Sequence, residues 1–328
     1  MTSTDTALPP QAAAARRWLA PLGAAAVAAF VVACLGFDGR AWHWPALDDP
    51  VIAGLRLPRV AAALVVGASL SAAGAALQAL FRNPLADPGL IGTSSGAVLA
   101  VVSVLALGVD GVGLPAAAFA GGLAATWILL VAARLLGGGE VSMLLLGLVL
   151  GMFVAAATGL MLLLSDDLTL RAATVWLSGH LGTTAGASLA AATPVAAAGL
   201  ALLVALGRDL DCLMLGEEEA RSLGVQVERV RLLTAIGASL AVGAAVSVAG
   251  VIGFIGMMVP NACALVLGGS RRRLIAASAI VGGLFLLLFD TAARSIAYPV
   301  DLPVGLLAGL SGPVFFVWLL RRRARGVA

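Results

Sequence analysis

The sequence contains no lysine: all 20 of its basic residues are arginine, against 17 acidic residues. A Walker A loop places a lysine on the β- and γ-phosphates of ATP, so the chain cannot be a standard P-loop ATPase. It can form no lysine Schiff base either. Charged residues make up only 11% of the 328 residues, and no basic stripe interleaves with aromatics, which argues against nucleic acid as a partner.

Histidine and cysteine are also scarce. The two histidines cannot build a histidine-rich metal site, and the three cysteines lie far apart without a Cys-x-x-Cys pair. We therefore expect no metal ion and no cofactor on this chain. The run Val31-Val32-Ala33-Cys34 imitates a lipoprotein processing site, but an uncleaved first membrane span is the favoured interpretation.

Apolar residues dominate what remains. They make up 61% of the chain, and the mean hydropathy is +1.06. Because about 20 consecutive apolar residues suffice to cross a bilayer, the pattern predicts an all-α membrane protein in one permease domain, 1–328. The ten predicted spans are 18–37, 60–80, 92–109, 114–136, 141–164, 185–206, 230–249, 251–268, 274–296 and 304–320.

The arginines orient these spans. With both termini in the cytoplasm, fifteen arginines fall on the inner side and five on the outer side. The outer five are Arg40, Arg56, Arg59, Arg171 and Arg294. Since positive residues accumulate on the cytoplasmic side, we expect both termini there.

A short motif that occurs twice in the sequence indicates a possible inverted repeat. Arg59-Val60 precedes Gly67-Ala68-Ser69-Leu70 by six residues, and Arg229-Val230 precedes Gly237-Ala238-Ser239-Leu240 in the same way. The two segments open spans of opposite direction, as in many transporters. Coincidence in a chain of biased composition explains the match equally well.

Two inner segments interrupt the apolar pattern. The prolines of Arg82-Asn83-Pro84-Leu85-Ala86-Asp87-Pro88 forbid a continuous helix, so this segment is either part of a translocation pathway or an ordinary turn. Segment 208–231 holds ten charged residues around an apolar Leu213-Met214-Leu215. It predicts two short helices joined at a glycine, which either bind a cytoplasmic partner or form a solvated loop.

Two groups of polar residues are expected on the outer side. Arg171, Thr174 and Ser178 share one face of a short helix beside Trp176 and His180. That helix could border a pore, although a lone histidine is more often a satisfied interfacial residue. Asp290 and Arg294 stand four residues apart in the ninth predicted span, which favours an ion pair and places Arg294 at the outer surface.

Taken together, these segments resemble the FecCD-type permeases, which are the membrane subunits of ATP-driven importers for ferric siderophores, haem and cobalamin. The matching blocks run in the family's order from about Arg56 to Leu320. They include Leu57-Pro58-Arg59, Gly74 and Gln78, Arg82 to Pro88, Gly92 and Gly96, Leu215 to Gly224, Gly253 to Gly256, Val259-Pro260, Asp290 with Arg294, Leu302 to Gly305, and Gly312 to Phe315. Asn261 departs from the pattern, since many members carry histidine after this proline.

The resemblance implies a type II ABC importer permease fold that works as a homodimer in the bacterial inner membrane. Two separate ATPase subunits with their own ATP and magnesium would dock inside, and a substrate-binding protein would dock outside on Arg56, Arg59 and Arg294. The ATPase-coupling residues would be Leu215, Gly216, Glu217, Glu218, Ala220, Arg221, Ser222, Leu223 and Gly224. The expected pathway or gating residues are Gln78, Asn83, Pro84, Arg171, Thr174, Trp176, Ser178, His180, Pro260 and Asn261.

The cargo expected from family frequency is a ferric siderophore first, haem second and cobalamin third. The alternative function is an ion-coupled secondary transporter with inverted repeats. Such a transporter should carry carboxylates near the midplane of the membrane, where here only Asp290 approaches that depth.

Overall fold

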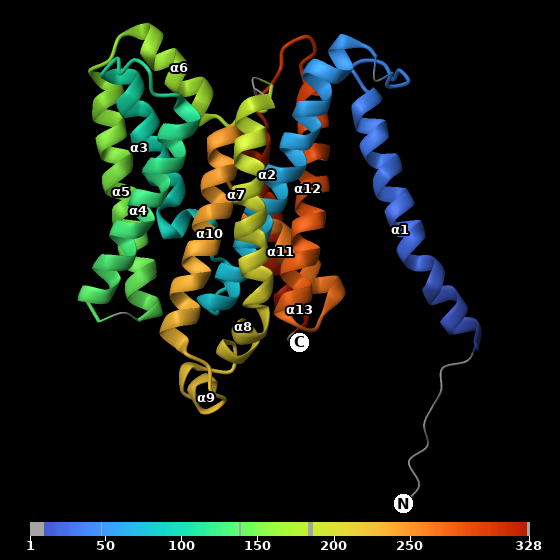
Figure 1. Ribbon diagram of the computed structural model, residues 1–328, viewed down its shortest axis with the longest axis vertical. Coiled ribbons are helices and arrows are strands. Elements are labelled where there is room, and N and C mark those ends of the chain that lie inside the picture. The colour runs from blue at the N-terminus through green and yellow to red at the C-terminus, as the bar shows by residue number, and fades with distance from the viewer. Residues whose placement is uncertain (1–9, 47, 138, 183–185, 327–328) are drawn as a thin grey trace, which may run out of the picture.

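The computed structural model describes residues 10–46, 48–137, 139–182 and 186–326, and within this part of the chain ten helices form the bundle (Figure 1). They are α1 (Pro10–Gly36), α2 (Leu57–Leu80), α3 (Thr93–Ala106), α4 (Leu114–Leu135), α5 (Glu140–Leu163), α7 (Gly186–Ala205), α10 (Val227–Ala249), α11 (Ile255–Leu267), α12 (Arg271–Ile296) and α13 (Val304–Gly326). Each coincides with one predicted span.

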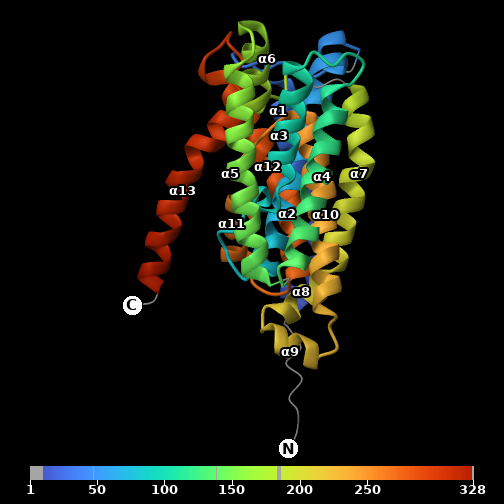
Figure 2. The same cartoon turned by 90° about the vertical axis from the view of Figure 1, so that its left-hand side faces the viewer.

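Three further helices lie at the ends of the bundle. The helix α6 (Asp167–Leu177) lies at one end, and α8 (Gly207–Leu213) and α9 (Glu217–Ser222) lie at the other (Figure 1). We call these the α6 end and the α9 end. The last residues of α13 and the first of α1 lie toward the α9 end, as an even number of spans requires (Figure 2).

The ten helices differ in length. Within the described residues, seven helices are long and apolar enough to cross a membrane, and three apolar helical stretches are shorter: Gly23–Gly36 of α1, α3 with 14 residues and α11 with 13. Helices of that length cover only about 20 Å of a hydrocarbon core about 30 Å thick. Irregular backbone replaces the missing turns, because Pro84 and Pro88 precede α3, and Gly250 (φ 69°) and Phe254 (φ 66°) precede α11.

The helix order supports the inverted repeat. Helices α2 to α5 follow a long, short, long, long order, and α10 to α13 repeat it. The first helix of each set runs in the opposite direction, since α2 starts at the α6 end and α10 starts at the α9 end (Figure 1). The packing is reciprocal as well, because α2 packs on α12 of the second set and α10 packs on α4 of the first.

Small residues let α2 occupy the centre of the bundle, where it packs against α7, α10, α11 and α12. Gly74 of α2 lies so close to the carbonyl oxygen of Gly256 that a Cβ at position 74 would overlap it. Gly96 of α3 meets Gly121 of α4 in the same way. Close backbone approach of this kind gives membrane helices their van der Waals contact, since lipid removes the hydrophobic drive between them.

Three buried hydroxyls tie the two repeats together. Thr93 at the start of α3 lies 2.8 Å from Thr126 of α4, and Ser239 of α10 donates to Thr126 at 3.2 Å. Thr126 in turn donates to the carbonyl of Ile91 at 3.1 Å. Each hydroxyl therefore has a partner in a region that water does not reach.

Helices α1 and α13 diverge from the bundle (Figures 1 and 2). Helix α1 contacts it mainly near its end, where Cys34 and Leu35 are buried. The middle of α13 exposes Leu310 and Val314.

Candidate functional site

An ion-pair network lies at the α6 end and is centred on Arg59, in the first turn of α2. Arg59 Nε donates to both oxygens of Asp290 on α12, at 3.0 and 2.9 Å, and Nη2 donates to Asp290 Oδ1 at 2.8 Å. The Asp290 side chain is 0% exposed, and that of Arg59 is 13% exposed. Arg294 Nε lies 3.5 Å from Asp290 Oδ2, so one buried carboxylate serves two arginines. The predicted Asp290–Arg294 pair therefore exists, but Arg59 is the nearer partner of Asp290.

Asp301 completes this network from the segment between α12 and α13. Its two oxygens accept from Arg59 Nη1 at 2.5 Å and from Nη2 at 2.9 Å. Partial burial disfavours the charged carboxyl, but the hydrogen bond and charge of Arg59 outweigh it and hold the pKa of Asp301 below its ordinary value. His180 Nε2 lies 3.7 Å from the same carboxylate.

The three arginines expected to dock a binding protein lie at this end, but two of them are occupied within the chain. The helix length predicted that Arg294 lies at the outer surface. It lies at this end, but its side chain is only 12% exposed and its guanidinium donates to the carbonyls of Phe37 and Cys34 at 3.2 and 3.4 Å. Arg59 is held by two carboxylates. Arg56 is half-buried, with Nη1 3.5 Å from the carbonyl of Leu35, and Arg40 is exposed.

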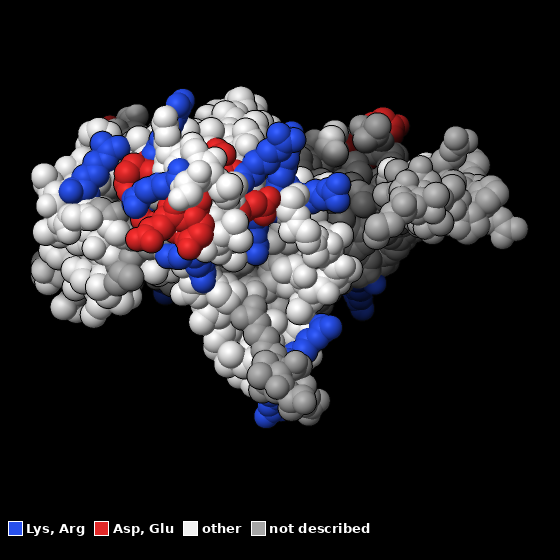
Figure 3. All heavy atoms as spheres, turned by 90° about the horizontal axis from the view of Figure 1, so that it is seen from below, with Lys and Arg blue, Asp and Glu red and all other residues white. Residues whose placement is uncertain are grey.

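The α9 end carries the two predicted short helices, α8 and α9, with Gly216 (φ 131°) between them. Leu215 and Leu223 flank α9 and are 66% and 62% exposed. Leu223 lines a groove of about 420 Å³, together with other apolar residues and with Asp209, Gln226 and Arg229. Seen from this end, acidic side chains gather at one spot with basic side chains around it (Figure 3). An apolar ridge with a charged rim is the usual composition of a protein-binding surface.

A group of ion pairs around Arg231, which we call the Arg231 clasp, fixes α9 to α10. Arg231 of α10 is buried and donates to Glu217 of α9 at 2.8 Å and to Glu228 at 2.7 Å. Arg221 reaches the other oxygen of Glu217 at 3.3 Å. Displacement of α9 must therefore move the start of α10 or break bonds to a buried guanidinium, which is costly.

The preceding helix α8 is fixed to α12. The carboxylate of Asp211 accepts from the backbone N–H of Arg271 at 2.8 Å, in the first turn of α12. Gly207 packs against the backbone of Arg272 so closely that a side chain there would overlap it. Since α12 carries Asp290 near its other end, one helix of 26 residues joins the surface around α9 to the network around Arg59.

Several predicted pathway residues meet inside the bundle. Asn261 of α11 donates to the carbonyls of Pro84 and Met257 at 2.7 and 2.8 Å, and Gln78 of α2 donates to the same Met257 carbonyl at 3.3 Å. Gln78, Pro260 and Asn261 are buried. The two amides thus donate to the carbonyls of Pro84 and Met257, and the segment after α2 is anchored inside the protein rather than forming a simple exposed turn.

The other predicted pathway residues lie on or just after α6. Arg171 is exposed, and the hydroxyls of Thr174 and Ser178 donate to carbonyls of their own helix, Leu170 and Val175, at 2.7 Å each. His180 donates its backbone N–H to Ala249 at the end of α10, at 2.9 Å. Trp176 packs on the core. The described residues bring no three metal-ligating side chains together.

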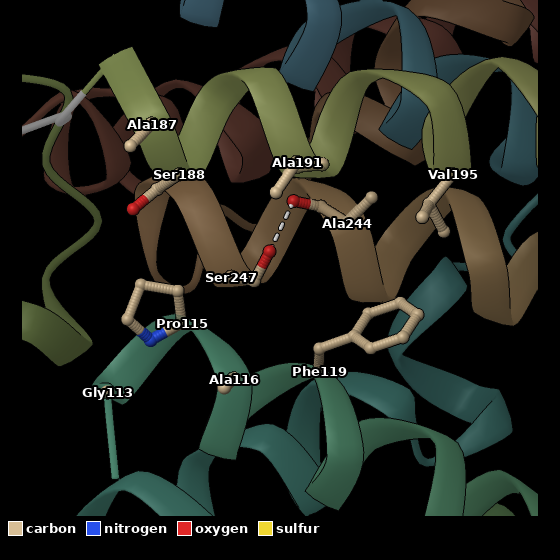
Figure 4. A pocket seen from close by; sticks show the side chains of 11 residues that line it. Gly113, Pro115, Ala116, Phe119, Ala187, Ser188, Ala191, Val195, Ala244 and Ser247 are labelled. Atoms are coloured by element: carbon tan, nitrogen blue, oxygen red, sulfur yellow. Dashed lines mark hydrogen bonds between the residues drawn. The ribbon is translucent and has the colours of Figure 1, made fainter. Parts of the chain in front are cut away.

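An apolar groove of about 440 Å³ runs between α4, α7 and α10 (Figure 4). Phe119 and Pro115 face Ala191 and Val195 across it, and the hydroxyl of Ser247 donates to the carbonyl of Ala244 at 2.9 Å. Among the described residues, no charged side chain lines this groove. Such a surface suits an acyl chain better than a polar ligand.

Sequence reasoning missed three members of these sites: the partnership of Arg59 with Asp290, the role of Asp301, and the clasp of Arg231. Asp301 directly precedes the Leu302-Pro303-Val304-Gly305 block, and an acidic residue at the end of an apolar run was a usable signal. The Arg59–Asp290 pair joins residues 231 positions apart, for which the sequence carries no local signal.

Comparison with known proteins identifies the family. The family model described as the FecCD transport family matches residues 27–322. A cobalamin import system permease protein, BtuC, of Halobacterium salinarum is 40% identical over 85% of this chain and 75% of its own length. The hemin transport system permease protein HmuU of Yersinia pestis is 39% identical over 82% of both chains.

The Fe(3+) dicitrate transport system permease protein FecC of Escherichia coli is 36% identical over 86% of both chains. Among solved structures, an inward-facing ABC transporter assigned to the metal-chelate type superposes with a TM-score of 0.82 at 27% identity. That match covers 90% of this chain and 96% of the solved chain. The chain belongs to the FecCD transport family and is the multi-pass membrane permease subunit of an ABC transporter.

Proposed function

We propose that this permease imports an iron chelate across the cytoplasmic membrane by alternating access, with a ferric siderophore as first choice, haem second and cobalamin third. Relatives that transport cobalamin, hemin and ferric dicitrate share 36–40% identity with it, which supports this cargo class. The observation that carries the proposal is the pairing of two partner surfaces, around Arg59 and around α9, on opposite ends of one rigid helix, α12.

We propose that the α9 end faces the cytoplasm and binds an ATPase subunit through Leu215 to Gly224. The exposed Leu215 and Leu223, of which Leu223 lines a groove of about 420 Å³, support this assignment, as does the lack of any lysine for a nucleotide site. ATP-driven motion of the ATPase would displace α9, and the Arg231 clasp and Asp211 would pass that motion to α10 and α12.

We propose that the α6 end faces outward and receives an extracytoplasmic binding protein through Arg56, Arg59 and Arg294. A second copy of the chain would then complete the passage. The apolar faces of α5 and α13, which expose Leu148, Phe153, Leu310 and Val314, are available to a second copy and to lipid. An apolar lining suits a bulky chelate, which a conduit must bind weakly enough to release.

The test is uptake into vesicles that contain the permease together with its partner ATPase, with binding protein and ferric siderophore added outside. Uptake should require ATP, and haem and cobalamin in parallel assays decide between the cargoes. Uptake driven by a proton or sodium gradient without ATP would instead support the secondary transporter. Asp290, the carboxylate such a transporter would need, is held by two arginines.

Leu215→Asp is expected to lower ATP-driven uptake at least about tenfold, because it places a charge in the centre of an apolar contact, where truncation of a hot-spot residue costs about 2 kcal/mol or more. Leu107→Asp is the matched control, since Leu107 is equally exposed at the α6 end. The measurement is initial uptake rate per assembled complex. Equal losses in both variants would remove the coupling role from Leu215.

Arg56→Glu is expected to weaken binding-protein docking about fivefold to tenfold, because a reversed charge at the rim repels an acidic partner. The measurement is the Kd of the binding protein for the permease–ATPase complex in nanodiscs. Arg40→Glu makes the same charge change at an exposed residue of the same end and should have a smaller effect. If ATPase assembly falls as well, the variant disturbs the fold and not docking alone.

A further inference from the structure

Arg59 has few donors left for a partner. A guanidinium carries five N–H donors, and four of them are engaged: Nε and one hydrogen of Nη2 by Asp290, and the other hydrogen of Nη2 and one of Nη1 by Asp301. Bidentate binding of a further carboxylate to Arg59 therefore requires that one of the two aspartates leave.

The two aspartates differ in their ability to leave. Asp290 is 0% exposed and also lies 3.5 Å from Arg294, so removing it would strand two buried cations. Asp301 is 35% exposed and belongs to the segment 297–303, which has no regular structure beyond a turn. It binds the nitrogens on the opposite side of the guanidinium from Nε. A partner carboxylate can therefore replace Asp301 on Arg59, whereas Asp290 stays in place.

We propose that Asp301 is an internal competitor for the binding protein, and that docking replaces the Asp301 carboxylate on Arg59 with an acidic side chain of that protein. This inference rests on the proposed docking role of the α6 end. The binding protein is then expected to present a carboxylate to Arg59.

Replacement of Asp301 on Arg59 would also change the contacts of the segment between α12 and α13. The segment 297–303 joins α12 to α13, and Gly305 at the start of α13 packs against the carbonyls of Ser178 and Val251. Release of Asp301 breaks its two hydrogen bonds to Arg59 and so removes a polar contact between this segment and α2, while the backbone N–H of Gly305 still donates to the carbonyl of Gly179. His180, which lies 3.7 Å from Asp301 and is fixed to the end of α10, borders the same segment.

The experiment measures the Kd of the binding protein for the permease–ATPase complex in nanodiscs. Asp301→Asn keeps the shape but weakens the contact with Arg59, so docking is expected to tighten about two- to fivefold, the value of a partly exposed ion pair. Asp301→Glu keeps a competing carboxylate and should stay near wild type. Asp48→Asn and Asp110→Asn are matched controls, because both remove one exposed negative charge at the α6 end.

Each outcome has one meaning. Tightening by Asp301→Asn alone supports competition. Tightening of equal size in Asp48→Asn or Asp110→Asn shows a general charge effect and overturns it. Unchanged or weaker docking of Asp301→Asn also overturns it, and weaker docking shows that Asp301 orients Arg59 instead. The proposed docking face fails separately, if Arg56→Glu leaves the Kd unchanged.

Discussion

Replacing Gly74 with alanine is expected to prevent correct assembly of the helix bundle. The added Cβ would overlap the carbonyl group of Gly256, which is backbone of α11 and cannot rotate away. Either α2 or α11 must then move, and α2 is the helix around which four others pack. Overpacking of side chains alone commonly costs about 1–3 kcal/mol, so a clash with backbone should cost at least about 3 kcal/mol.

The measurement is the yield of monodisperse protein after detergent extraction and its midpoint of thermal unfolding. Gly159→Ala is the matched control, because Gly159 lies inside α5 with open space around its Cα. That variant should be neutral or stabilise by up to about 1 kcal/mol, the helix propensity difference between glycine and alanine. Equal stability of the two variants would mean that α2 and α11 do not approach as closely as described.

Gly74 also shows which part of the fold the sequence could predict. Ten apolar runs predicted ten helices, because hydropathy and length alone decide whether a segment suits a bilayer. The same runs are longer than α3 and α11, since hydropathy does not register irregular backbone such as the positive φ angles of Gly250 and Phe254 before α11. Which glycines make close contacts was not predictable either: Gly96 meets Gly121, whereas Gly309 faces open space.

The candidate sites also contain features that the sequence could predict and features that it could not. The two short helices at the α9 end were predictable, because a glycine between charged stretches is a local signal. The clasp of Arg231 on Glu217 and the pairing of Arg59 with Asp290 depend on helices brought together by tertiary packing. The sequence placed Asp290 inside a membrane span, where a carboxylate requires a cationic partner, and it indicated Arg294, four residues away, as that partner. The choice of Arg59 required the position of α2 beside α12.

Asp290→Ala is expected to destabilise the permease by about 3–5 kcal/mol, the usual cost of removing one partner from a buried ion pair. The Asp290 side chain is fully buried and is shared by Arg59 and Arg294. Without it, Arg59 keeps Asp301, but Arg294 retains only carbonyl partners and the Thr291 hydroxyl. The measurement is the midpoint of thermal unfolding in detergent, with Asp110→Ala, an exposed acid of the same end, as control.

A second variant separates the stranded charge from the cavity that alanine leaves. The double variant Asp290→Leu, Arg294→Met fills the space and removes one of the two cations, and apolar replacement of a buried pair is often close to neutral. It should recover much of the stability lost in Asp290→Ala, while Asp301 continues to neutralise Arg59. If the double variant is no more stable than Asp290→Ala, the loss does not come from the uncompensated arginine. Because Arg59 is a proposed docking residue, recovered stability with weakened docking would show that Asp290 fixes Arg59 for the partner as well as for the fold.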